Sequence, residues 1–178
     1  FEQFRHWPVP VVLIAGNHEF DERELVRAWA DLRALCTDVG ITLLECGSRV
    51  ITDAQGRRIR LSGTTRWCDF DVFGEARRER ATRAAGYYMR VMRATRHGQP
   101  FDAAAVREEA LACRAWLQAE LTEPPLPHDA ARLTRRQGDW DASVVITHFA
   151  PSLRSAAVVA RTSSQRWPTA VRAGTCQS

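Results

Sequence analysis

The fold is decided by residues 9–20, VPVVLIAGNHEF, where an apolar run ends at a glycine and an Asn-His-acid sequence follows. Such a run is typical of a buried strand, and ligands of α/β proteins bind beyond the carboxyl ends of strands. Asn17 offers a neutral carbonyl oxygen to a divalent metal, and His18 can move a proton near neutral pH. The combination indicates metal-assisted phosphate chemistry. The alternative is an ordinary turn followed by a helix, because Gly-Asn is a common turn pair.

A second strand end has the same organisation. Residues 143–147, SVVIT, form a short run rich in β-branched side chains, and His148 follows directly. A histidine after a strand is more often a packed, hydrogen-bonded residue than a metal ligand. Two strand ends of this kind are better explained as parts of one site than as unrelated features. We therefore expect Asn17 and His148 to converge in space.

Three blocks resemble the calcineurin-like metallophosphoesterase superfamily. GNHEF at 16–20 and VVITHFAPS at 144–152 are similar to two of its signature blocks, and GTTRWCDFDVFG at 63–74 looks like a stretch of one bacterial branch. The resemblance implies hydrolysis of phosphate mono- or diesters, with a small phosphoester as substrate. It also implies two divalent ions (Mn, Fe or Zn) that clamp the phosphoryl group for in-line attack.

The resemblance assigns a role to each matching residue. Asn17 and His148 are expected to ligate one of the two metals. His18 is the expected catalytic residue, steadying the phosphoryl oxygens or protonating the leaving group, and Glu19 is expected to orient its imidazole. Phe149 departs from the pattern, because relatives often carry a second histidine there.

Other blocks of the family pattern are missing from the sequence. An Asp-x-His block and a Gly-Asp block belong before GNHEF, and a Gly-His-x-His block belongs after Ser152. We therefore interpret residues 1–155 as a partial phosphoesterase domain, a fragment that is weakly active or inactive by itself. Residues 156–178 are expected to form an irregular or disordered tail. The alternative is a non-catalytic phosphoesterase-like domain that binds a phosphorylated ligand or a protein partner.

Composition narrows the possible kinds of protein further. The net charge is +4, but every basic residue is arginine, a bias that reflects genome composition better than selection for nucleic acid, so a nucleic-acid partner is unlikely. No apolar stretch approaches the length of a membrane span. The five cysteines are widely spaced without a CxxC, which predicts reduced thiols in a cytoplasmic protein instead of a disulfide framework or a zinc knuckle.

The remaining sequence alternates between strand and helix patterns, which predicts an α/β (α+β) fold. A strand is expected at 41–44, and a hairpin at 49–52 and 58–63. The intervening helix is expected to start at Asp21, whose spacing to Glu24 resembles a capping box. Its buried stripe is expected to contain Leu25, Ala28, Trp29, Leu32 and Leu35.

A helical insertion is expected at about 75–122. Its first helix, residues 75–96, places its arginines outside, and its second begins after the N-cap Asp102. The expected apolar stripes are Ala81, Ala84, Tyr88, Val91 and Met92 in the first, and Val106, Ala110, Cys113, Leu117 and Leu121 in the second. We expect this pair to cap one edge of the site, on a partial four-layer metallophosphoesterase-like sandwich of mixed sheets flanked by helices. Trp67 and Asp69 could reach a substrate, although packing explains Trp67 equally well.

Overall fold

The computed structural model describes residues 1–122 and 139–151. Within them the chain has a mixed α/β fold, as its alternating patterns predict. None of the described helices is long and apolar enough to span a membrane. The tail expected at 156–178 lies outside the described residues.

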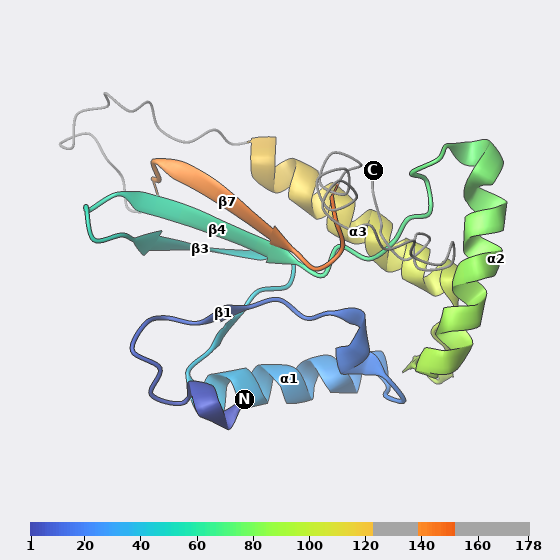
Figure 1. Ribbon diagram of the computed structural model, residues 1–178, viewed down its shortest axis with the longest axis horizontal. Coiled ribbons are helices and arrows are strands. Elements are labelled where there is room, and N and C mark those ends of the chain that lie inside the picture. The colour runs from blue at the N-terminus through green and yellow to red at the C-terminus, as the bar shows by residue number, and fades with distance from the viewer. Residues whose placement is uncertain (123–138, 152–178) are drawn as a thin grey trace, which may run out of the picture.

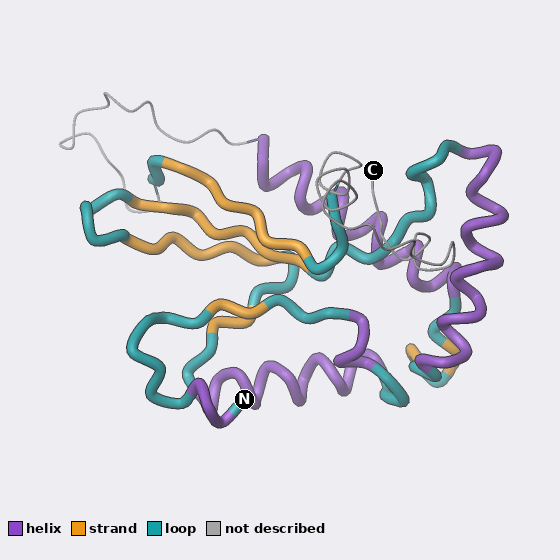
Figure 2. The backbone as a smooth tube through the Cα atoms, viewed as in Figure 1, coloured by secondary structure: helices purple, strands orange, loops and turns teal. Residues whose placement is uncertain are grey.

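A β-α-β unit forms the first half of the fold. Strand β1 (Val12–Leu13) pairs in parallel with β2 (Thr42–Leu43), and helix α1 (Leu25–Val39) connects them. Two 3₁₀ helices, η1 (Glu2–Phe4) and η2 (Asn17–Phe20), flank β1. Figure 2 shows this short pair of strands running above the long α1. Helix α1 ends at Gly40, whose φ of 77° is the left-handed conformation that glycine adopts without strain.

A three-stranded sheet forms the second half. The expected hairpin is confirmed: β3 (Gly47–Thr52) pairs antiparallel with β4 (Arg58–Thr64). β4 also pairs in parallel with β7 (Ala142–Thr147), and Thr64 lies opposite Thr147. The carboxyl ends of β4 and β7 therefore meet at one edge of the sheet, immediately before His148.

The two sheets pack face to face through alternate residues of β4. Gly63 faces the β1–β2 pair, because a Cβ there would lie 2.6 Å from Leu44 Cβ and 2.9 Å from Ile14 Cγ2. The preceding residue points to the opposite face, and the Ser62 hydroxyl donates to Glu120 of α3 at 3.1 Å. The layers therefore follow the order α1, the β1–β2 pair, the β3–β4–β7 sheet and α3 (Figure 1).

The expected helical insertion contains α2 (Glu75–Met92) and α3 (Ala103–Thr122), joined by the small hairpin of β5 (Thr95–Arg96) and β6 (Gln99–Pro100). Asp102 caps α3 as predicted, accepting from the Ala105 N–H at 2.9 Å. The buried positions of α3 are Ala103, Val106, Ala110, Cys113 and Leu117, which confirms its stripe apart from the exposed Leu121. All of these buried residues except Leu117 belong to the same hydrophobic core as α1. α3 is thus a core layer on β4, and α2 packs outside it (Figure 1).

Three details of the helices were predicted wrongly. The N-cap of α1 is Glu24, whose carboxylate accepts from the Arg27 N–H at 2.9 Å, whereas Asp21 lies beyond the end of η2. In α1 the stripe is confirmed at Leu25, Ala28 and Leu32, but it continues through Cys36 and Val39, and Leu35 is exposed. In α2 the buried residues are Ala85 and Met92. Tyr88 and Val91 were also expected in the buried stripe, but both are exposed. α2 therefore buries only Ala85 and Met92, and several of its large side chains face solvent.

Candidate metal site at the strand ends

Asn17 and His148 come together at the carboxyl ends of β1 and β7. Asn17 is the first residue of η2, four residues beyond the end of β1, and His148 follows β7 directly. Asn17 Oδ1 lies 3.0 Å from His148 Nε2, although 131 positions separate the two residues in sequence. The expectation that they converge is confirmed, while their role as metal ligands stays a prediction.

Gly16 makes this approach possible. A Cβ at position 16 would lie 2.7 Å from His148 Cε1, 2.9 Å from Nδ1 and 3.0 Å from Nε2, closer than side-chain atoms pack. The glycine has φ −96°, a conformation open to any residue, so space and not backbone strain requires glycine here. The imidazole of His148 therefore lies directly against the backbone of the GNHE turn.

Glu19 holds the same turn from the inside. Its Oε2 accepts a hydrogen bond from the Gly16 N–H at 2.6 Å. Its expected contact with the His18 ring is not formed: Asp21 Oδ2 lies 2.8 Å from His18 Nδ1 instead. Asp21 thus takes the orienting position assigned to Glu19, because η2 places residues 18 and 21 on one side of the turn. The His18 side chain is 80% exposed, which leaves its Nε2 available to a ligand in solvent.

The electrostatic setting of His148 favours a neutral imidazole. Much of the residue is exposed, but its ring lies against Gly16 and meets the Phe149 ring edge-on, with centroids 4.8 Å apart. This partial desolvation lowers the pKa of His148, the charge of nearby Glu19 raises it in part, and His18 adds a further lowering. A neutral imidazole is the form that binds a metal.

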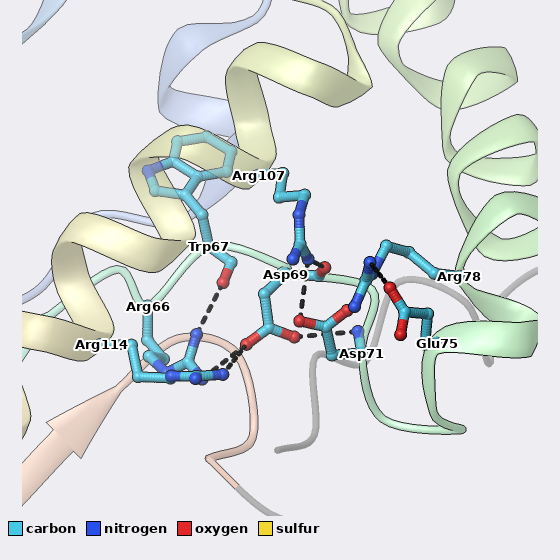
Figure 3. A network of polar contacts seen from close by, with 8 residues as sticks. All are labelled: Arg66, Trp67, Asp69, Asp71, Glu75, Arg78, Arg107 and Arg114. Carbon is cyan, nitrogen blue, oxygen red and sulfur yellow. Dashed lines mark hydrogen bonds and ion pairs between the residues drawn. The ribbon is translucent and has the colours of Figure 1, made fainter.

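A network of polar contacts centred on the buried Asp69 follows β4 in the chain (Figure 3). Asp69 is fully buried, and its Oδ2 receives the guanidinium groups of Arg66 and Arg114, each at 3.2 Å. Asp69 Oδ1 accepts from the Asp71 N–H at 3.1 Å. Asp71 in turn pairs with Arg78 and Arg107. The carboxylate of Asp69 is therefore a structural acceptor, and it is not exposed to a substrate.

Trp67 also packs within the fold. It is 2% exposed and contacts the rings of Phe20, Phe101 and Phe149 at centroid distances of 5.6, 5.3 and 6.1 Å. The Phe149 N–H donates to the Thr65 carbonyl at 3.3 Å, which connects the segment after β7 to the segment after β4. The packing interpretation of Trp67 is thus confirmed. Its ring also packs against Phe149, the residue that follows His148.

The donor set of Asn17 and His148 fits a divalent metal. As the side chains stand, the 3.0 Å between Nε2 and Oδ1 is a hydrogen-bond distance, and a cation bound between them would replace that hydrogen bond. Within residues 1–122 and 139–151, no group of three imidazole, thiolate or carboxylate ligands gathers around His148. A cation here would therefore take two ligands from the described residues.

Sequence reasoning missed a separate group of potential ligands. Glu45, Cys46 and Cys113 place their terminal atoms within 4.8 Å of one another, whereas the spacing of the cysteines had argued against any thiolate cluster. The sequence contains no sign of it, because neither cysteine lies in a recognisable ligand motif and the contact depends on the packing of α3. The described cysteines form no disulfide, as expected.

A scan of protein-family models and searches of curated proteins and solved structures found nothing that matches this chain.

Proposed function

We propose that this chain is a metal-dependent phosphoesterase of the calcineurin-like type, which hydrolyses phosphate mono- or diesters. The observation that carries the proposal is the contact between Asn17 Oδ1 and His148 Nε2 at 3.0 Å. An amide oxygen and a neutral imidazole are both ligands of Mn, Fe and Zn. The layer order α1, β1–β2, β3–β4–β7, α3 is compatible with the sandwich that the sequence blocks imply.

The roles of the residues follow from their contacts. Asn17 and His148 would hold the cation, and a divalent metal bound there supplies a Lewis acid for the phosphoryl oxygens. His18 donates a proton from Nε2 to the departing oxygen, since Asp21 engages Nδ1 and keeps the ring oriented. Glu19 holds the turn that carries both Asn17 and His18.

A second candidate is a phosphoesterase-like domain that binds a phosphorylated ligand without turning it over. It is favoured by the small number of protein ligands that the described residues bring to Asn17 and His148. In that case His18 would act as a hydrogen-bond donor to a phosphate oxygen and no leaving group would be released.

The test combines metal binding with turnover of p-nitrophenyl phosphate and bis-p-nitrophenyl phosphate in the presence of Mn²⁺. We expect His18→Ala to retain metal binding and lose turnover by roughly 10²–10⁴-fold, the usual contribution of a general acid. Asn17→Ala and His148→Ala should lose metal as well. The matched control is His97→Asn, an exposed histidine at φ 53°, a backbone conformation that asparagine tolerates. Binding of inorganic phosphate without turnover would select the second candidate, and equal metal binding in all four variants would refute the first.

A further inference from the structure

A second group of ligands lies away from the strand ends, where three segments meet. Glu45 and Cys46 form the short connection between β2 and β3, and Cys113 lies in the middle of α3. Cys46 Sγ is 3.8 Å from Cys113 Sγ. Glu45 Oε1 lies 3.5 Å from Cys113 Sγ and 3.9 Å from Cys46 Sγ. The three atoms thus form a nearly equilateral triangle.

The edges of this triangle match a tetrahedral zinc site. Zinc lies about 2.3 Å from a thiolate sulfur and about 2.0–2.2 Å from a carboxylate oxygen. With tetrahedral angles, two sulfurs then lie about 3.8 Å apart, and a sulfur and an oxygen lie about 3.5 Å apart. All three observed distances are within 0.4 Å of these values. The arrangement could accept the ion with little movement of the side chains.

The carboxylate is already oriented for this role. Glu45 Oε2 accepts from the Thr65 N–H at 2.7 Å and from the Thr65 hydroxyl at 2.8 Å, which directs Oε1 towards the two sulfurs. Hydrogen bonds of this kind to the outer oxygen are how proteins fix a ligating carboxylate. Thr64, the last residue of β4, adds its hydroxyl at 3.2 Å from Oε1.

The backbone also turns both neighbouring side chains to the same side. Consecutive residues of an extended chain normally point in opposite directions. Cys46 instead has φ 44°, in the left-handed region, and both Glu45 and Cys46 reach Cys113. Cys113 is buried on α3, while Glu45 and Cys46 are half-buried, so the group is not sealed from solvent.

We propose that Glu45, Cys46 and Cys113 form a zinc site whose fourth position is taken by water. On binding, each thiol releases its proton to solvent and both electron pairs are donated to the metal, which undergoes no redox change. The site is separate from Asn17 and His148. It would clamp the β2–β3 connection to α3 across the end of β4.

The experiment is a titration of the reduced chain with Co²⁺ as a spectroscopic substitute for Zn²⁺, followed by displacement with Zn²⁺. We expect a thiolate-to-cobalt charge-transfer band that saturates at one ion and disappears when zinc is added. Cys46→Ser and Cys113→Ser should each lose the band or shift it strongly. Cys36→Ser is the matched control, because Cys36 is buried in α1 outside this group. His148→Ala should also retain the band, which separates this site from the strand-end site.

A second measurement covers the case in which a serine variant fails to fold. On the unaltered chain, saturating zinc should protect Cys46 and Cys113 from alkylation by iodoacetamide, as mapped by mass spectrometry, and leave the labelling of the other cysteines unchanged. The absence of a charge-transfer band in the unaltered chain would overturn the proposal. So would an unchanged band in folded Cys113→Ser, or recovery of a Cys46–Cys113 disulfide after exposure to dioxygen in the presence of saturating zinc.

Discussion

Replacing Gly16 by alanine tests the strand-end site with a single methyl group. The new Cβ would lie 2.7 Å from His148 Cε1, whereas ordinary contact begins near 3.4 Å, so the ring must move by 0.7 Å or more. Overpacking of this kind costs about 1–3 kcal/mol of folding stability, and we expect the low end because His148 can rotate towards solvent. The 3.0 Å contact with Asn17 cannot survive that movement. Losing the alignment of one ligand should weaken Mn²⁺ binding by about 10–100-fold, as removal of an orienting partner does at other metal sites.

The assay is calorimetric titration with Mn²⁺, alongside urea unfolding of both proteins. Gly86→Ala is the matched control, because a Cβ there meets no atom closer than 4.0 Å and position 86 lies inside α2. It should leave metal binding unchanged and stabilise the fold by about 0.5–1 kcal/mol, the helical preference of alanine over glycine. Undiminished Mn²⁺ affinity in Gly16→Ala would refute the argument that His148 must lie against this turn to bind metal.

Three further predictions concern the polar network of Asp69 and Asp71 and the packing between the two sheets. Asp69→Ala should destabilise the fold by about 3–5 kcal/mol in urea unfolding, because it leaves the buried Arg66 guanidinium without its carboxylate, and a loss below about 1 kcal/mol would contradict this. Burial raises the pKa of Asp71, but hydrogen bonds from Arg78 and another arginine outweigh it and hold the pKa below its usual range. The stability from this carboxylate is therefore present above about pH 4 and lost as pH falls through the lowered pKa, so Asp71→Asn should flatten the acid side of a stability-against-pH curve. Gly63→Ala should cost about 1–3 kcal/mol, measured by thermal unfolding, because its Cβ would lie 2.6 Å from an atom of the facing layer.

Local signals predicted the elements of the fold, with errors where neighbours decide. The hairpin of β3 and β4 was readable because its polar turn is local: Asp53 Oδ1 accepts from the N–H groups of both Gln55 and Arg57. The cap of α1 was misplaced because Asp is a preferred N-cap residue and Glu is not, whereas a tertiary contact favours Glu24 here. The Glu24 carboxylate also accepts from the His97 N–H at 3.1 Å, which no local pattern contains.

The site was predictable to the extent that it lies on strand ends. Asn17 and His148 each follow an apolar strand, and ligand sites of α/β proteins lie beyond such ends. The two strands belong to different sheets, so the meeting of these residues depends on the packing of one sheet on the other. The partner of His18 was not predictable, because Glu19 is adjacent and Asp21 is three residues away, and only the 3₁₀ geometry of η2 selects the second. The thiolate triangle depends on the packing of α3 against the end of β4, which sequence spacing does not encode.

The position of His148 is finally a question of strand register. Side chains alternate across β7, so a slip of one residue against β4 would turn the imidazole away from Asn17. The register is fixed at the start of β7, where the Arg58 N–H donates to Asp141 Oδ2 at 2.8 Å and the Asp141 N–H donates to the Arg58 carbonyl at 2.7 Å. The Arg60 guanidinium also lies over the Trp140 ring, 3.8 Å from its centroid. Contacts at the far end of the sheet therefore determine whether an amide oxygen and an imidazole can share one cation.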